Sequence, residues 1–197
     1  MVGARLAAIS TREGLQSFNA AGTTRFGAPM RASYALQPDG GARVEIESGN
    51  AGFLLDALLG IDFLEEGELL LDGRLRPSAP ADLQVTIRDA RLRNAPFLTQ
   101  ILSLGSLRGL ADTLGGEGVL FSEISIPLKV GSGRFVVDGG RASGPALGLT
   151  ANGWLEPETG ALNFDGVLVP SFGVNSALGG IPIIGDLVVG REGEGIF

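Results

Sequence analysis

The sequence feature that most constrains the fold is an alternation of apolar and polar side chains around residue 126. Ile124, Ile126, Leu128 and Val130 occupy every second position, and Glu123, Ser125 and Lys129 alternate with them. Successive side chains of a β-strand point to opposite faces of a sheet. This segment therefore predicts an antiparallel sheet with one apolar face and one face in water.

Similar strands, separated by glycine- and proline-rich turns, recur on both sides of this segment. In the second half of the chain they form a predicted four-strand meander at 119–130, 134–141, 147–155 and 161–169, with turns at 131–133, 143–145 and 156–160. Further strands are expected at 2–9, 31–36, 42–47, 68–75 and 83–88. The predicted fold class is mainly β (α+β): a curved antiparallel meander that forms an open trough.

Short amphipathic helices interrupt the strands. Asn50 and Asn94 are expected to cap two of these helices, and Gly60 is expected to end the first. The predicted helices lie at 50–59, 95–103, 106–114 and around 172–189. Their apolar side chains, which we expect to cap the end of the trough or to lie against a membrane, are Phe97, Leu98, Ile101, Leu102, Leu107 and Leu110.

Composition excludes several classes of function. The 197 residues include no histidine and no cysteine, so Ser-His-Asp sites, Cys/His zinc sites, haem ligation and disulfides are all excluded. A net charge of −7 argues against a nucleic-acid groove, which normally carries a basic stripe. The 32 glycines follow no collagen period and are typical of turns, bulges and helix ends.

Two arrangements could be taken for catalytic groups. Glu156 and Glu158 could form an acid–base pair, but they fall in a predicted hairpin turn, where exposed carboxylates are common. Lys129 could activate Ser125, but the strand face that carries both is expected to lie in water. We therefore expect no catalytic residue and no enzyme activity, and a hydrolase that uses the carboxylates is the remote alternative.

Other motifs also favour ordinary structural roles. The acidic residues between 62 and 68 lack the glycine-centred spacing of a calcium loop, and the glycine-rich segment 190–195 lacks the dinucleotide-binding spacing. Trp154 is interpreted as a core or rim anchor. The sequence therefore predicts no metal and no cofactor.

The apolar alternation also assigns residues of the later strands to one apolar face, although Gly139 and Gly140 could insert a bulge and shift the register. The residues placed on this face are Ile124, Ile126, Leu128, Val137, Leu147, Leu149, Leu162 and Phe164.

A family resemblance rests on segments that occur in order over residues 82–197. These segments are 91–98, 102–110, 116–121, 144–153, 166–175, 180–185 and 190–197. The stretch that contains them resembles the C-terminal region of the AsmA-like superfamily, in particular the large YhdP-type proteins of Gram-negative bacteria. Residues 50–74 look like the preceding helix–strand unit of that family, more weakly.

The resemblance implies a non-enzymatic role in phospholipid transport between the inner and outer membranes, with an apolar β-trough that holds acyl chains. The expected partners are phospholipid acyl chains and also a membrane surface or other envelope proteins. The resemblance further implies a periplasmic location, in a parent protein anchored in the inner membrane by a helix that this chain lacks. A buried methylene contributes about 0.8 kcal/mol, so full enclosure of a 14-carbon chain would give roughly 11 kcal/mol. Because such binding would hinder release, a carrier is expected to enclose the chain only partly.

The domain interpretation divides the chain into a preceding β-rich segment, 1–78, and the AsmA-like C-terminal region, 79–197, which is expected to be truncated at its C-terminal end. The competing functional interpretation is a structural, interaction or capping domain in outer-membrane biogenesis. In that case the helices would fill the trough and no lipid would enter.

Overall fold

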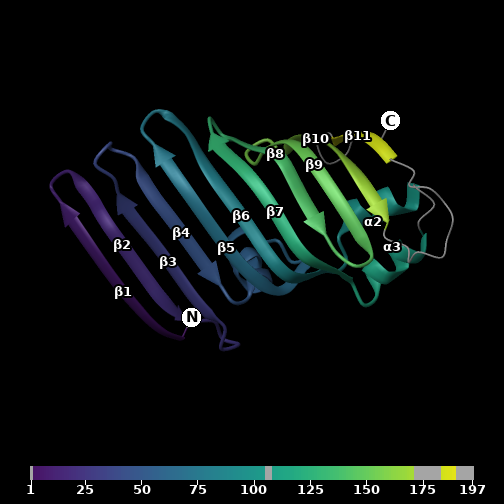
Figure 1. The fold of residues 1–197 in the computed structure, drawn as a ribbon, viewed down its shortest axis with the longest axis horizontal. Helices are drawn as coiled ribbons and strands as arrows, with labels where there is room; N and C mark the ends of the chain where they lie inside the picture. Colours follow the sequence, from purple (N-terminus) through teal and green to yellow (C-terminus); the bar gives the residue numbers. More distant parts are fainter. Residues whose placement is uncertain (1, 105–107, 171–182, 190–197) are drawn as a thin grey trace.

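Eleven β-strands pair in the order in which they occur in the chain. The computed structural model describes residues 2–104, 108–170 and 183–189. Every neighbouring pair is antiparallel, from β1 at one edge to β11 at the other, so the sheet is open and uncurled (Figure 1). The strands are β1 Val2–Thr11, β2 Gly14–Thr23, β3 Pro29–Leu36, β4 Ala42–Ser48, β5 Leu64–Arg76, β6 Ala79–Leu92, β7 Val119–Gly131, β8 Arg134–Ser143, β9 Leu147–Glu156, β10 Ala161–Pro170 and β11 Ile183–Val189. The predicted mainly β meander is confirmed.

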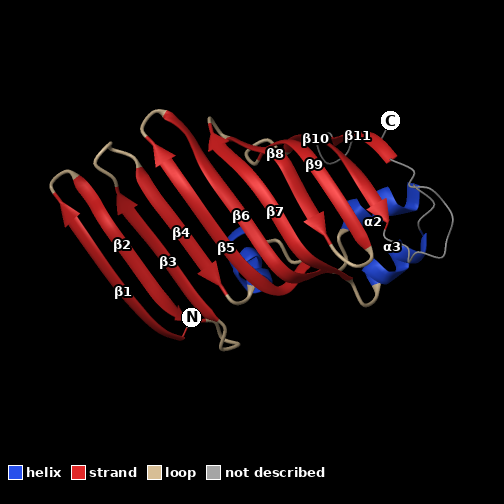
Figure 2. Ribbon diagram, in the orientation of Figure 1, coloured by secondary structure: helices blue, strands red, loops and turns tan. Residues whose placement is uncertain are grey.

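Three short helices, α1 Ala51–Leu59, α2 Pro96–Leu104 and α3 Arg108–Gly115, lie within one or two residues of their predicted bounds. In Figure 2 they gather at one end of the strands, and strands β1 to β3 have no helix beside them. Helix α1 follows β4 directly, and α2 and α3 connect β6 to β7. The fourth predicted helix is wrong where it can be compared: 183–189 form strand β11, and 172–182 lie outside the described residues.

Local signals account for the ends of α1. The side-chain oxygen of Asn50 accepts a hydrogen bond from the Phe53 backbone N–H at 2.8 Å, as expected of an N-cap. Gly60 ends the helix at φ 67°, a left-handed conformation that glycine adopts readily, and its N–H donates to the carbonyl of Asp56 at 2.9 Å.

The predicted cap of α2 is wrong. Asn94 has a left-handed backbone with φ 52°, and the helix begins two residues later, at Pro96. The Asn94 N–H instead donates to the carbonyl of Leu114 at 3.0 Å, which ties the start of α2 to the end of α3. Asparagine tolerates this conformation better than most residues do, so it fits the turn between β6 and α2.

Glycine and left-handed residues adjust the register of the sheet. Gly139 has φ 78°, and a bulge separates the pairs formed by Val137 and Gly140 with β9, so the predicted bulge is confirmed. Glu66 and Asp89, with φ 59° and 52°, interrupt the alternation in β5 and β6. Beyond these interruptions both strands still direct apolar side chains into one core.

The expected boundary at residue 78 falls in the tight turn between β5 and β6. These strands pair over nearly their whole length, from Leu64 opposite Leu92 to Arg76 opposite Ala79. The sheet therefore continues through this position without a break.

Candidate functional site

One face of the sheet is apolar from its first strands to its last. The register places Leu71, Val85 and Ile126 side by side on β5, β6 and β7. A neighbouring row begins at Phe18 and Tyr34 on β2 and β3 and continues across the sheet. Side chains that stand directly opposite each other in an antiparallel pair share a face. We call this surface the apolar face.

The eight residues predicted for this face all share it in the structure. Leu128 lies opposite Val137, Leu149 opposite Leu168, and Phe164 opposite Gly153. The bulge beside Gly139 shifts the register of β8, so that Val137 and the apolar residues of the later strands lie on the same face as those of β7. The eight residues are Ile124, Ile126, Leu128, Val137, Leu147, Leu149, Leu162 and Phe164.

The helices cover one end of the apolar face, which we call the covered end. Leu98 and Leu102 of α2 and Leu114 of α3 are at most 1% exposed and pack into one core with Phe121 and Leu147. Ile124 and Leu149 are half-buried against this core. Helices pack a hydrophobic stripe onto a sheet to remove it from water, and these helices do so here. The predicted side chains of Phe97, Ile101, Leu107 and Leu110 lie outside the described part of the structure.

The remaining strand ends of the apolar face lie outside this core, and we call them the open band. Its large side chains are half-buried by their neighbours in the sheet, except Leu6, which is 71% exposed. Its members are Leu6, Phe18, Tyr34, Val44, Leu83, Ile126, Leu128, Val130, Phe135, Val137, Leu155, Leu162 and Phe164. Ten strand spacings of about 4.8 Å make the sheet roughly 48 Å wide from β1 to β11.

The N-terminal half of this band was not predicted from the sequence as part of the candidate site. The signal was present in the same alternation: Val44 and Ile46 lie opposite Gly73 and Leu71 of β5. What the sequence did not reveal is that these strands join the later meander in one sheet.

The opposite face is polar and carries ion pairs between neighbouring strands. Arg43 and Asp72 approach to 2.6 Å, and hydrogen bonding to this carboxylate raises the pKa of the guanidinium. Arg88 lies 3.6 Å from Glu123, and the side-chain amide of Gln84 donates to the Ser125 hydroxyl at 3.0 Å. Exposed pairs of this kind contribute little stability each. They show which face of the sheet is compatible with water.

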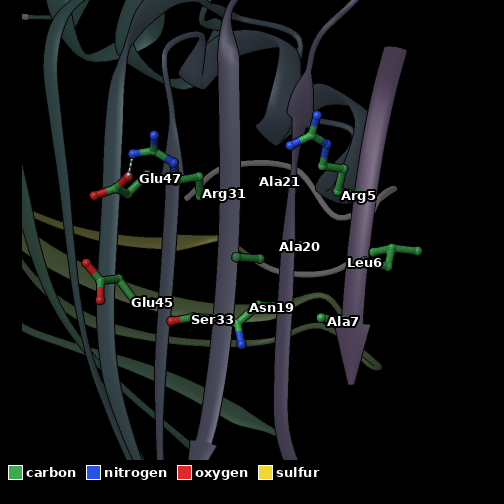
Figure 3. A pocket seen from close by; sticks show the side chains of 11 residues that line it. Arg5, Leu6, Ala7, Asn19, Ala20, Ala21, Arg31, Ser33, Glu45 and Glu47 are labelled. Carbon is green, nitrogen blue, oxygen red and sulfur yellow. Dashed lines mark hydrogen bonds and ion pairs between the residues drawn. The ribbon is translucent and has the colours of Figure 1, made fainter. Parts of the chain in front are cut away.

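A shallow hollow of about 460 Å³ lies on this polar face over strands β1 to β4 (Figure 3). Arg5, Arg31, Ser33 and Glu47 contribute to its lining, and Arg31 is joined to Glu47 at 3.5 Å. The lining combines both signs of charge with small side chains such as Ala21. It therefore offers no concentrated charge to a ligand.

The carboxylates considered for catalysis occupy an ordinary turn. Glu156 forms an ion pair with Arg134 and accepts a hydrogen bond from Thr159, and the bond from Arg134 is the main cause that lowers the pKa of Glu156. A carboxyl with a lowered pKa is ionised at neutral pH and is poorly suited to act as a general acid. Trp154 lies under the Arg134 guanidinium, 4.2 Å from the ring centroid, on the polar face rather than in the core.

The other predicted motifs also show no site geometry. Within the described ranges, no group of three or more acidic side chains is arranged to hold a metal ion. Ser125 and Lys129 both lie on the polar face, and the Ser125 hydroxyl is bonded to Gln84. The glycine-rich segment 190–195 lies outside the described residues.

A small exposed aromatic cluster lies where the β2–β3 loop meets α1. Phe26 and Phe53 pack edge to face with ring centroids 5.9 Å apart, and Arg25 lies over both rings. Phe26 is 65% exposed, and Leu58 and Leu59 at the end of α1 are similarly exposed. This cluster was not predicted from the sequence, because it depends on the approach of two distant segments.

Comparison with protein-family models, curated proteins and solved structures found no significant match to this chain. In the part of the chain that is described, no helix has the length and apolarity required to cross a membrane.

Proposed function

We propose that the open band binds the acyl chains of phospholipids, so that this chain is a non-enzymatic, lipid-carrying segment of an envelope protein that moves phospholipid between the inner and outer membranes. The observation that supports the proposal most is that one face of the sheet is apolar and the opposite face is polar. One face carries an apolar row that runs across the strands and is not covered by the helices, and the other carries ion pairs.

The open band suits reversible binding better than a closed cavity would. Enclosure of a 14-carbon chain on all sides would contribute roughly 11 kcal/mol, and contact on one side only would contribute about half of that. Association also costs several kcal/mol in lost translational and rotational freedom. The net affinity is therefore modest, which allows a chain to leave the surface again.

The family resemblance in residues 82–197 agrees with this proposal and supplies the substrate class and the periplasmic location. The residues proposed to contact the acyl chains lie in the open band and include Ile126, Leu128, Val137, Leu162 and Phe164. Leu147, by contrast, is completely buried in the core and cannot contact a lipid unless the helices move.

The covered end favours a second candidate function. There the helices fill the space above the sheet with the protein's own side chains, including Leu98, Leu102 and Leu114. If the open band is likewise covered in the assembled envelope, the chain is a structural or capping module and holds no lipid.

The test is native mass spectrometry of the purified chain, followed by displacement of a fluorescent fatty acid. Ile126→Asp introduces a charge into the open band, and Ser125→Asp introduces the same charge one residue away on the polar face. Loss of about two methylene contacts costs about 1.6 kcal/mol, so Ile126→Asp should weaken binding roughly tenfold and Ser125→Asp should not.

Both variants should retain the wild-type circular dichroism spectrum, because both positions are at least partly exposed. Absence of lipid from the wild-type chain, together with no binding of the fatty acid, would favour the capping module. Equal effects of the two variants would exclude the open band as the binding surface.

A further inference from the structure

The open band contains one polar side-chain atom, the hydroxyl oxygen of Tyr34. Every other member of the open band has a hydrocarbon side chain, and Tyr34 is the only tyrosine of the chain. It lies inside the sheet on β3, directly opposite Phe18 of β2 and Val44 of β4. Strands on both sides therefore determine the surroundings of Tyr34.

The Tyr34 hydroxyl is available to a ligand. The residue is half-buried, and its hydroxyl forms no hydrogen bond with the residues that the structure describes. A tyrosine at such a site packs its ring among apolar neighbours and keeps its hydroxyl, which can donate and accept, in contact with a polar group or water. An alkyl chain laid across the hydroxyl would displace water without replacing its hydrogen bond. This position therefore favours the polar end of a lipid over its tail.

An unbroken apolar row leads from Tyr34 across the sheet to β10. A Cβ atom at Gly73 would lie 2.3 Å from Leu83 Cδ2 and 2.9 Å from Val44 Cγ2, so these two side chains meet over the glycine and leave no gap in the row. Seven strand spacings of about 4.8 Å give the row a length of roughly 34 Å. The register places the following residues in the row, in this order: Tyr34, Val44, Gly73, Leu83, Leu128, Val137, Gly153 and Phe164.

We propose that Tyr34 is a positioning residue for the polar end of a bound acyl lipid. Its hydroxyl donates a hydrogen bond to an oxygen at that end, and the tail lies along the row toward β10. An ester carbonyl and a carboxylate offer the same acceptor chemistry, so phospholipids and free fatty acids both satisfy it. This inference rests on the proposed binding of acyl chains to the open band, and it adds the orientation of the chain on that surface.

The test uses two spin-labelled stearic acids, one with the nitroxide near the carboxyl group and one with the nitroxide near the methyl end. Each is bound to the isotope-labelled chain, and the broadening of backbone amide signals is measured by NMR. The carboxyl-end label should broaden signals around Tyr34 and Val44, and the methyl-end label should broaden signals around Leu128 and Val137.

Tyr34→Phe removes only the hydroxyl. In this variant the two labels should broaden overlapping sets of signals, because the chain can then lie in either direction. The affinity for the fatty acid should fall roughly three- to tenfold, as expected for the loss of one hydrogen bond. The circular dichroism spectrum should match that of the wild type, because the hydroxyl bonds to no described residue.

Ser33→Ala is the matched control, because it removes a hydroxyl one residue away on the polar face, where Ser33 lies opposite Glu45. It should change neither the affinity nor the broadening pattern. The inference is overturned if Tyr34→Phe keeps the wild-type pattern and affinity, or if Ser33→Ala has the same effect as Tyr34→Phe. A wild-type chain that binds both labels with the same broadening pattern overturns the inference alone. A wild-type chain that binds neither label overturns the proposed acyl-chain binding as well.

Discussion

The division of the apolar face into a covered end and an open band predicts two very different responses to the same substitution. Leu147 at the covered end is 0% exposed and packs in the helical core, and Leu128 in the open band is only half-buried. Both are leucines on neighbouring parts of one face, and both can be changed to alanine. Comparison of the two variants therefore shows the effect of burial alone, because the chemical change is the same at both positions.

The magnitudes follow from burial. Leu147→Ala removes three carbons from a closed core and leaves a cavity, which costs about 2–5 kcal/mol. Leu128→Ala removes the same atoms from a partly exposed site without enclosing a cavity, so only part of the transfer free energy, roughly 1 kcal/mol, is lost. In a chain of this length 1 kcal/mol shifts Tm by roughly 2–4 °C.

Thermal and urea unfolding followed by circular dichroism measures both values. We expect Tm to fall by roughly 4–20 °C for Leu147→Ala and by no more than roughly 4 °C for Leu128→Ala. Similar losses at the two positions would refute the reasoning, because they would mean that the open band is as fully packed as the helical core.

Two further predictions concern local structure and charge. Gly60→Ala should lower the free energy of unfolding by about 1–2 kcal/mol, because alanine is strained at φ 67°. The control Gly109→Ala, at a position in α3 with open space around it, should raise the free energy of unfolding by about 0.4–1 kcal/mol. Denaturant titration measures both changes, and changes of the same sign would contradict this reasoning. Arg134→Gln should return the pKa of Glu156 upward toward its ordinary value, measured by carboxyl-carbon NMR titration, because the bond from Arg134 is the main cause of the lowered pKa. A carboxyl with a lowered folded-state pKa stabilises the fold above its unfolded-state pKa, and this contribution is lost as pH falls through the folded-state pKa. The variant should therefore show less loss of stability on acidification than the wild type, and an unchanged acid limb would contradict this assignment.

Strand alternation was enough to predict much of the sheet. The regular alternation in β7 fixed the sides of Ile124, Ile126 and Leu128, and the turn chemistry on either side set the antiparallel order of β7 to β10. The glycine pair at 139 and 140 correctly indicated a bulge, because a left-handed backbone is accessible to glycine at little cost.

Elements that depend on their neighbours were missed or misassigned. β2 has Leu15 and Phe18 as its large apolar residues among small and polar side chains. It has little alternation of its own and is held by pairing with β1 and β3. β11 contains a glycine and an apolar run that was assigned to helix, yet its pairing with β10 makes it a strand. A local pattern cannot report pairing between segments.

The covered end could not be predicted from the sequence for the same reason. The apolar stripes of the helices were visible, but whether Leu98 and Leu102 pack on the sheet or face a membrane depends on where the chain turns. The left-handed turn at Asn94, hydrogen-bonded to Leu114, closes α2 and α3 into one unit, and this contact joins residues twenty positions apart.

The central claim is that acyl chains lie on the open band, and photo-crosslinking tests it most directly. A phospholipid with a diazirine on its acyl chain is bound, irradiated and mapped by peptide mass spectrometry. The account predicts adducts on the open-band residues of β6 to β10, including Leu128, Val137 and Phe164, and few on polar-face residues such as Ser125. Adducts distributed equally over both faces, or confined to the helices, would contradict it.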